Sequence, residues 1–187
     1  MTTKRKYTDV MVDIETTGVN PDENAMIQLA AVRFNLITEE VDGDDMFNRS
    51  LAIPAKRFWD EGTREWWGKR LDTYRGIMAR MEPVERVLRD FTTWAAKDQD
   101  GEKLRFWSKP SHFDFMFIQS YYKQFPVASF PFDFREAQDM RSFLRGLYFP
   151  NDLPESTVKL EGVAHDAIFD VLHQIQVLQD YVKKCVS

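Results

Sequence analysis

The sequence predicts an α/β protein in which helices flank a mixed β-sheet. Three observations predict this class: β-rich apolar segments come first along the chain, helical patterns with one further strand follow, and no repeat or low-complexity segment interrupts the order. We expect about five strands, the first three of them antiparallel. A chain of 187 residues with 43% hydrophobic content can bury one core of ordinary size. We therefore expect a single domain over residues 1–187.

The early strands are segments of apolar and β-branched residues bounded by turn residues. They are expected at residues 7–14, 26–34 and 46–53. Gly18 and Pro21 separate the first strand from the second, and Pro54 ends the third. Between the second and third strands, acidic residues crowd around Gly43, which is typical of a solvated hairpin turn. We assign no function to this acidic turn.

The later part of the chain has apolar residues at helical spacing. Helices are expected over residues 61–81, from Pro83, from Ser111, over 135–147 and over about 164–184. Pro83 suits the first turn of its helix, whose apolar face begins with Val84 and Val87. A short strand at 104–107 precedes the helix that Ser111 is expected to cap. A strand followed by a helix predicts a parallel crossover, so the sheet is mixed.

The composition favours a cytoplasmic protein without a cysteine-based site. The start of the chain, residues 1–7, is polar and basic, and it lacks the apolar stretch of a signal peptide or membrane span. The single cysteine, Cys185, supplies neither a disulfide framework nor a zinc site. The net charge of −5 gives no global attraction to nucleic acid. Residues 56–80 are nevertheless locally basic, with seven lysines and arginines against four acidic residues.

Asp13 and Glu15 are the first candidate site residues. Side chains two residues apart along a strand point to the same side, so these carboxylates converge at the end of the first strand. An Asp-x-Glu pair can also merely mark where a strand leaves the core. The next residues, Thr16, Thr17 and Gly18, offer hydroxyls and a flexible backbone that a terminal hydroxyl or phosphate can approach closely. The whole hexapeptide therefore favours a binding site.

Three further candidates lie later in the chain. Asp114 falls in the first turn of the helix after the fourth strand, near the sheet edge where ligands bind, although an acid there also suits the helix dipole. His165 and Asp170 are five residues apart, or about 140° around an ideal helix, and share a site most easily if His165 belongs to the preceding loop. The alternative is a histidine satisfied at the surface or in the core, to which we assign His112 and His173.

Four carboxylates and a histidine carry a resemblance to a known family. The hexapeptide Asp13–Gly18, a Phe-Asp pair on a helix and His-x-x-x-x-Asp resemble the three motifs of the DEDDh 3′-5′ exonucleases, which are DnaQ-like members of the ribonuclease H-like superfamily. Residues 63–67, 138–142 and 162–166 are similar to segments of the DexA-type phage and prophage branch, so the resemblance covers most of the chain. Ala167 stands where a tyrosine would indicate the sister DEDDy group.

The resemblance has one departure, in the loop before Asp114. The DexA-type branch usually has a glycine soon after the tryptophan that corresponds to Trp107, whereas this chain continues with Ser108, Lys109 and Pro110. We therefore expect this loop to be shaped differently from that of the branch.

The resemblance implies a fold, a reaction and a set of metal ions. The fold is the ribonuclease H-like mixed sheet, and the reaction releases 5′-mononucleotides from the 3′ ends of single-stranded RNA or DNA. Two Mg²⁺ or Mn²⁺ ions would be held by Asp13, Glu15, Asp114 and Asp170. His165 would be the general base, a role that suits an imidazole near neutral pH. The chemistry independently favours such ions, because two carboxylates about 4 Å apart repel by roughly 4 kcal/mol and oxygen ligands select hard cations.

Further residues are candidate substrate contacts. We expect Thr16–Gly18 to seat the 3′-terminal nucleotide. Either Trp66 or Trp67, but not both, should touch substrate, because neighbouring tryptophans on a helix usually include a core anchor. Cationic residues that are candidate phosphate contacts, although each is also typical of ordinary surface charge, are Arg64, Lys69, Arg70 and Arg141.

Partners and alternative functions follow from the same reading. The resemblance implies a bacterial or phage-infected host cytoplasm, no membrane partner and, because several relatives are homodimers, a dimer. A catalytically silent nucleic-acid-binding module of the same fold is one alternative, but it would lack a carboxylate or the histidine, and none is missing. A magnesium-dependent phosphatase of small esters is another. RNA and single-stranded DNA both remain open as substrates, because their distinction depends on contact with the 2′-hydroxyl.

Overall fold

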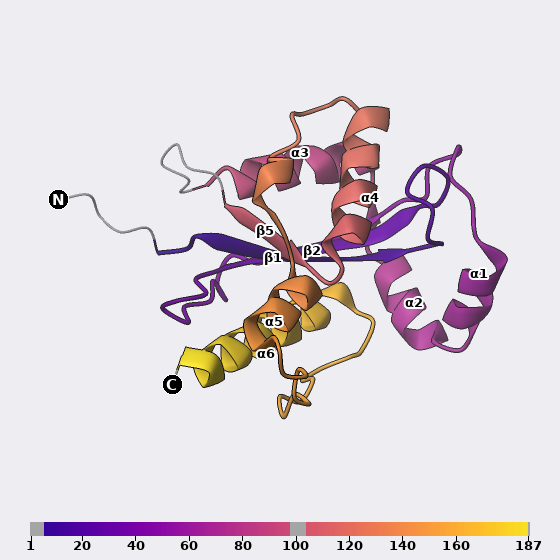
Figure 1. Cartoon of the computed structure of the whole chain (residues 1–187). Helices are drawn as coiled ribbons and strands as arrows, with labels where there is room; N and C mark the ends of the chain where they lie inside the picture. Colours follow the sequence, from indigo (N-terminus) through magenta and orange to yellow (C-terminus); the bar gives the residue numbers. More distant parts are fainter. Residues whose placement is uncertain (1–5, 98–103, 187) are drawn as a thin grey trace.

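A computed structural model describes residues 6–97 and 104–186 (Figure 1). Residues 1–5, part of the polar start from which the absence of a signal peptide was predicted, lie outside the described residues. The strands are β1 (Asp9–Thr16), β2 (Met26–Phe34), β3 (Phe47–Leu51), β4 (Met81–Glu82), β5 (Arg105–Ser108) and β6 (Ala137–Asp139). The helices are α1 (Glu61–Gly68), α2 (Leu71–Met78), α3 (Val84–Ala95), α4 (Ser111–Gln124), α5 (Met140–Tyr148), α6 (Ala167–Val186) and the short 3-10 helix η1 (Phe134–Glu136).

The strands form one mixed sheet in the order β4-β3-β2-β1-β5-β6. The first three strands are antiparallel, as the sequence predicts, and β5 lies parallel to β1. The helix α4 follows β5 and leads to β6, which pairs parallel with β5. The predicted α/β class with a mixed sheet is therefore confirmed. The sheet has six strands rather than about five, because the two-residue β4 and the three-residue β6 are too short to give a sequence pattern.

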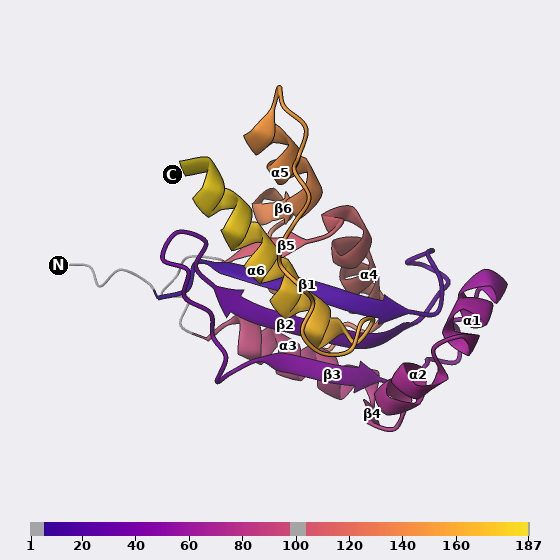
Figure 2. The same ribbon diagram turned by 90° about the horizontal axis from the view of Figure 1, so that it is seen from below.

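Helices cover both faces of the sheet. Figure 1 shows α3 and α4 on one face and α5 and α6 on the other, while α1 and α2 lie beyond one end of the strands. Seen from below, α6 runs diagonally across β1 and β2 (Figure 2). Alternate residues of β1 serve the two layers: Val10 and Val12 pack under α3 and α4, whereas Met11 packs under α6. Asp13 and Glu15 share the face of Met11, so they emerge beneath α6.

Three of the predicted helices have different bounds, and one of them is α6, which begins at Ala167 rather than at about residue 164. The segment predicted as one helix over 61–81 forms two, α1 and α2, that meet at Lys69 and Arg70. The helix predicted over 135–147 begins only at Met140, because the side chain of Asp139 accepts a hydrogen bond from the Ser142 backbone N–H at 2.8 Å and caps it there. The residues before Asp139 pair with β5 instead.

Ser111 does not cap α4, which corrects the sequence prediction. Pro110 occupies the cap position, and no side chain there accepts a hydrogen bond from the helix. The backbone N–H of Ser111 instead donates to Asp139 Oδ2 at 2.9 Å. Asp139 thus ties the start of α4 to the start of α5, so the loop around Lys109 is held from both sides.

The acidic turn around Gly43 is not merely solvated, which corrects a second prediction. Asp42 is buried, and Asp42 and Asp45 each form an ion pair with Arg33, at 2.8 and 2.6 Å. Arg33 itself is 3% exposed, so this charge needs partners within the protein. Two acids of the turn are therefore structural counter-charges.

No helix in the part of the chain that the structure describes is long and apolar enough to span a bilayer.

Candidate active site

The candidate carboxylates come together from three elements. Asp13 and Glu15 lie at the end of β1, Asp114 in the first turn of α4 and Asp170 in the first turn of α6. With His165 they line one open hollow of about 470 Å³. The fold therefore brings together residues that are up to 157 positions apart in the sequence, from 13 to 170.

Each of the three aspartates has one oxygen held by an N–H donor. The pairs are Gln174 Nε2 to Asp13 Oδ1 (2.9 Å), the Ile14 backbone N–H to Asp114 Oδ1 (3.1 Å) and the His165 backbone N–H to Asp170 Oδ2 (2.9 Å). A carboxylate fixed at one oxygen keeps a defined orientation and leaves its other oxygen for a ligand. The hydrogen bonds therefore orient the acidic side chains toward the hollow without satisfying them.

His165 stands in the loop before α6, as its spacing from Asp170 predicts. The helix begins at Ala167, and His165 has a positive φ of 64°. Donor atoms of Glu15, His165 and Asp170 all lie within 4.8 Å of one another, so the imidazole belongs to the carboxylate cluster. On its other side, the ring packs edge-on against Trp66, with centroids 4.6 Å apart.

Gln28 of β2 anchors the loop that carries His165. Its side chain is fully buried, donates to Asp166 Oδ1 at 2.6 Å and accepts a hydrogen bond from the Ala167 backbone N–H at 3.1 Å. Arg80 also lies 3.6 Å from Asp166. A non-glycine residue with a positive φ is strained and needs such restraint from its neighbours. The network around Gln28 and Asp166 therefore supplies the restraint for His165.

Burial raises the pKa of all four carboxyl groups. The pKa of Asp13 rises to about 7, mainly by burial and further by the charge of Asp170, while the hydrogen bond from Gln174 lowers it. Burial, and then the charge of Asp13, raise the pKa of Glu15 and of Asp114 well above their usual range. Burial also raises the pKa of Asp170. Within the described residues, no lysine or arginine forms an ion pair with any of the four.

The donor set fits divalent metal ions. Each carboxylate disfavours ionisation of its neighbours, and a cation placed among them would reverse this effect. Carboxylate oxygens suit hard ions such as Mg²⁺ and Mn²⁺. The candidate ligands are Asp13, Glu15, Asp114 and Asp170, with the imidazole of His165 close enough to join them.

The loop Thr16–Gly18 uses most of its polar groups within the protein. Thr17 is fully buried, and its hydroxyl donates to the Phe58 carbonyl oxygen at 2.8 Å and accepts from the Ala25 backbone N–H at 2.7 Å. A Cβ at Gly18 would lie 2.3 Å from the Asn24 side chain, so glycine is needed for close packing. Thr16 is 9% exposed and donates to the Gly18 carbonyl oxygen. Thr17 and Gly18 therefore shape the loop. Neither residue offers a free side-chain group for the predicted contact with substrate.

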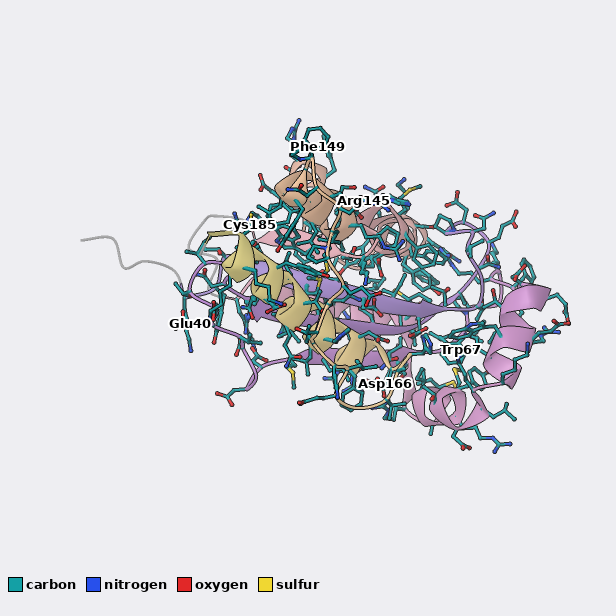
Figure 3. All side chains as sticks on the ribbon, turned by 60° about the horizontal axis from the view of Figure 1, so that its bottom comes forward. Glu40, Trp67, Arg145, Phe149, Asp166 and Cys185 are labelled. Atoms are coloured by element: carbon teal, nitrogen blue, oxygen red, sulfur yellow. The ribbon has the colours of Figure 1, made fainter. Side chains whose placement is uncertain are left out.

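The two neighbouring tryptophans have different surroundings. Trp67 is 2% exposed, packs in the core and donates its indole N–H to the Thr16 carbonyl oxygen at 3.0 Å, which removes it from the candidate substrate contacts. Trp66 is half-buried between His165 and Arg70, whose guanidinium lies 3.7 Å from the ring centroid. Figure 3 labels Trp67 beside the strand ends and Asp166 at the start of α6. Of the pair, only Trp66 remains a candidate.

The predicted cationic contacts divide in the same way. Arg141 is exposed and lines the hollow of the carboxylates. Arg64 pairs with Glu61 at 3.5 Å, and Arg70 stacks on Trp66. Lys69 lines a separate hollow at the junction of α1 and α2. Arg141 is thus the predicted cation that the fold places at the candidate site.

Sequence reasoning missed several residues that line the same hollow, among them Gln174, Lys109 and His112, which was expected to be an ordinary surface or core histidine. Gln174 lies four residues after Asp170 on α6, so helical spacing alone places both on one face, and this signal was available. Lys109 lines the hollow from the loop after β5, and its peptide bond with Pro110 is cis. No sequence pattern indicates Lys109.

Several solved structures have a similar fold. Cell-death related nuclease 4 (CRN-4) matches with a TM-score of 0.68 and 20% identity, over 96% of this chain and 65% of its own. The Mg²⁺- and Mn²⁺-bound S. pombe Pop2p matches with a TM-score of 0.67 and 11% identity, over 93% of this chain and 82% of its own. The nuclease domain of 3′hExo, a DEDDh family member bound to rAMP, matches with a TM-score of 0.64 and 15% identity, over 95% and 93%.

These comparisons and the site together define the class. The chain shares the fold of these structures, and its site brings together the carboxylates and the histidine that carry the resemblance to the DEDDh motifs. It spans slightly less than two thirds of the CRN-4 chain. The model of the 3′-5′ exoribonuclease Rv2179c-like domain matches residues 8–182, and the chain belongs to this family. A search of curated protein sequences found no match.

Proposed function

We propose that this chain shortens single-stranded RNA from its 3′ end and releases 5′-mononucleotides. The observation that carries the proposal is the convergence of Asp13, Glu15, Asp114 and Asp170 around His165 with no lysine or arginine of the described residues paired to them. We also propose that residues 1–187 act as one exonuclease domain and that the chain belongs to the DexA-type branch, on the segments quoted above.

Two Mg²⁺ or Mn²⁺ ions would be held by Asp13, Glu15, Asp114 and Asp170. Such ions activate water and stabilise the attacking and leaving oxygens of an in-line displacement. The similar Pop2p was solved with both metals bound, which supports this choice. Within the protein, Gln174 orients Asp13 and the His165 backbone N–H orients Asp170, so the free carboxylate oxygens face the hollow.

His165 is proposed as the general base. Its imidazole lies within 4.8 Å of the donor atoms of Glu15 and Asp170, which is where a water beside the carboxylates would lose its proton. The same proximity would allow the imidazole to bind a metal ion instead. The two roles differ in consequence: a base affects turnover, whereas a ligand also affects metal affinity. We propose the first role because oxygen ligands suit Mg²⁺ better than nitrogen.

The 3′ terminus would be seated between β1 and α1. Thr16 lies directly after the carboxylates, and Trp66 offers a half-buried aromatic ring beside His165. Aromatic rings stack on bases with little sequence preference, which suits an exonuclease. Arg141, on the rim of the hollow, is proposed to contact a phosphate.

The test is degradation of end-labelled oligonucleotides with Mn²⁺ or Mg²⁺. We expect a 5′-labelled RNA to shorten stepwise from its 3′ end and a sequence-matched DNA to shorten more slowly. His165→Ala should abolish most turnover while metal affinity stays near that of the wild type. Asp44→Asn, at an exposed acid of the turn around Gly43, is the matched control and should retain full activity.

Other outcomes would select another function. Binding without shortening would indicate a silent nucleic-acid-binding module. Hydrolysis of small phosphate esters beside intact polymer would indicate a phosphatase. A loss of metal affinity in His165→Ala as large as in Asp170→Asn would make the imidazole a ligand and contradict its proposed role as base.

A further inference from the structure

A second hollow lies next to the candidate active site, between α5 and α6. Its volume is about 350 Å³, and we call it the α5–α6 hollow. Its apolar floor consists of Met140, Leu144, Val177 and Tyr181, all of them buried. Small-molecule sites have volumes of roughly 300–1,000 Å³ and mostly apolar walls, so this hollow is large enough for a nucleobase.

The rim of the α5–α6 hollow is cationic. It carries Lys109, Arg141, Arg145 and His173, and no carboxylate lines it. Throughout residues 6–97 and 104–186, the first three of these side chains have no ion-pair or hydrogen-bond partner. Exposed Arg64 is instead paired with an acid. Unpaired cations around an apolar floor are the complement of a nucleotide, which has an apolar base and an anionic phosphate.

The two hollows are continuous along one line of cations. Lys109 and Arg141 line both of them. Arg145 follows Arg141 by four residues on α5, so the two side chains lie on the same helical face, and Figure 3 labels Arg145 there. On α6, Gln174 faces the carboxylates while His173 faces the α5–α6 hollow. A single-stranded nucleic acid can therefore pass from one hollow to the other with cationic side chains beside its phosphates throughout.

The direction in which a bound single-stranded nucleic acid runs follows from the residues on each side of the carboxylates. On one side, Trp66 packs against His165, and α1 lies beyond the strand ends. On the other side, the rim opens over Arg141 toward Arg145. If the 3′ nucleotide is seated against Trp66, the rest of the strand leaves over Arg141.

We propose that the α5–α6 hollow binds the single-stranded chain on the 5′ side of the scissile phosphodiester, with a base on its apolar floor and a phosphate at Arg145. This inference rests on the proposed function. It implies that a hexanucleotide reaches the hollow and binds more tightly than a dinucleotide, which has nothing to place there. The enzyme then prefers oligonucleotides over dinucleotides.

The test compares substrate lengths in variants of Arg145. Arg145→Glu should raise KM for a hexaribonucleotide by roughly tenfold, with kcat unchanged, because it removes one charged phosphate contact. KM for a dinucleotide should not change. Arg145→Lys should restore most of the affinity. The control is Arg89→Glu, an equally exposed arginine on α3 across the sheet, which should leave both substrates unaffected.

A binding measurement separates this inference from the proposed function. With metal chelated by EDTA, fluorescence anisotropy of a labelled hexaribonucleotide should show weaker binding in Arg145→Glu and a salt slope reduced by about 0.7. If the wild type shortens RNA but Arg145→Glu matches it at both lengths, the α5–α6 hollow is not a binding site, whereas the exonuclease stands. If Arg145 governs binding of the hexamer but nothing is shortened, the hollow stands and the exonuclease proposal fails.

Discussion

Strand β1 carries carboxylates at both of its ends, and the partners of these carboxylates differ between the two ends. At the start, Asp9 is fully buried and accepts hydrogen bonds from the side chains of Arg105 and Trp107, each at 2.7 Å. At the end, Asp13 and Glu15 have no cationic side chain of the described residues in an ion pair, and burial raises the pKa of both.

The difference separates a structural carboxylate from functional ones. Asp9 has a bidentate guanidinium and an indole N–H, so its charge is compensated inside the protein. Asp13 has one amide donor, from Gln174, and no ion pair among the described residues; besides its burial, the charge of Asp170 raises its pKa, and the charge of Lys109 lowers it by less. Buried polar groups are normally satisfied, so a cluster that is not is a candidate for a bound ion.

The largest expected effect is on activity, at the end of β1 where Asp13 and Glu15 have no ion-pair partner among the residues that the structure describes. Asp13→Asn should lower the rate of RNA shortening on the order of 10³-fold, because metal chemistry supplies several kcal/mol of transition-state stabilisation. Thermal unfolding of the metal-free variant at pH 8 should occur at or above the temperature of the wild type, since a repelled charge is removed. A large loss of stability would contradict the comparison.

The next largest effect is on stability, at the start of β1, where the carboxylate of Asp9 has hydrogen-bond and ion-pair partners. Asp9→Asn should lower the free energy of unfolding by about 2–3 kcal/mol, or a melting temperature by roughly 5–10 °C, because Arg105 and Trp107 lose a charged acceptor. Urea titration measures the first quantity and calorimetry the second. Activity assayed well below the melting temperature should be near that of the wild type. Loss of turnover without loss of stability would reverse the assignment.

A smaller effect is expected where the protein does supply a donor to Asp13. Gln174→Leu removes the hydrogen bond to Asp13 Oδ1 and also a buried Oε1 that has no partner, so stability should not fall. The affinity for Mn²⁺, measured calorimetrically, should drop roughly 10- to 100-fold, as is typical of partners that orient metal ligands. Gln176→Leu, at an exposed glutamine of the same helix, should change nothing. Equal metal affinity in both variants would exclude a positioning role for Gln174.

The smallest effect is a pH dependence. The pKa of folded Asp13 is about 7, against the usual 3.8. The folded state therefore binds more protons between these values, and the stabilising contribution of protonated Asp13 is fully present below pH 3.8 and lost as pH rises through 7. We expect the melting temperature of the metal-free protein to fall from pH 5 to pH 8. Mg²⁺ should raise it more at pH 8, because ligands must be ionised to bind. A larger gain at pH 5 would contradict this.

The sequence was sufficient for the features that depend on local periodicity. The alternation in β1 predicts that Asp13 and Glu15 share a face, and the spacing in α3 predicts its buried side, where Val84 and Val87 are buried. The five-residue separation of His165 and Asp170 places the histidine in the loop, where the structure has it. These features lie within a few residues of each other, so backbone geometry alone relates them.

Other features depended on which distant elements meet. Trp66 and Trp67 look equivalent in the sequence, yet only Trp67 reaches the carbonyl oxygen of Thr16 in the core. The acids around Gly43 look solvated until β2 brings Arg33 against them. No local pattern records such contacts, because they are created when the sheet order is formed.

By itself, the sequence determined the kinds of side chains and their local faces: carboxylates at the end of one strand, a third and fourth acid at helix starts, and a histidine in a loop. Only the tertiary structure decided which of these are left unsatisfied. Asp9 and Asp13 are the same residue on the same strand and face, and they differ because Arg105 of β5 stands beside one, whereas other acids stand beside the other. Strand pairing and helix packing determine which residues lie beside each carboxylate. These neighbours determine whether the charge is compensated within the protein, and stabilises the fold, or is left uncompensated and can bind a ligand.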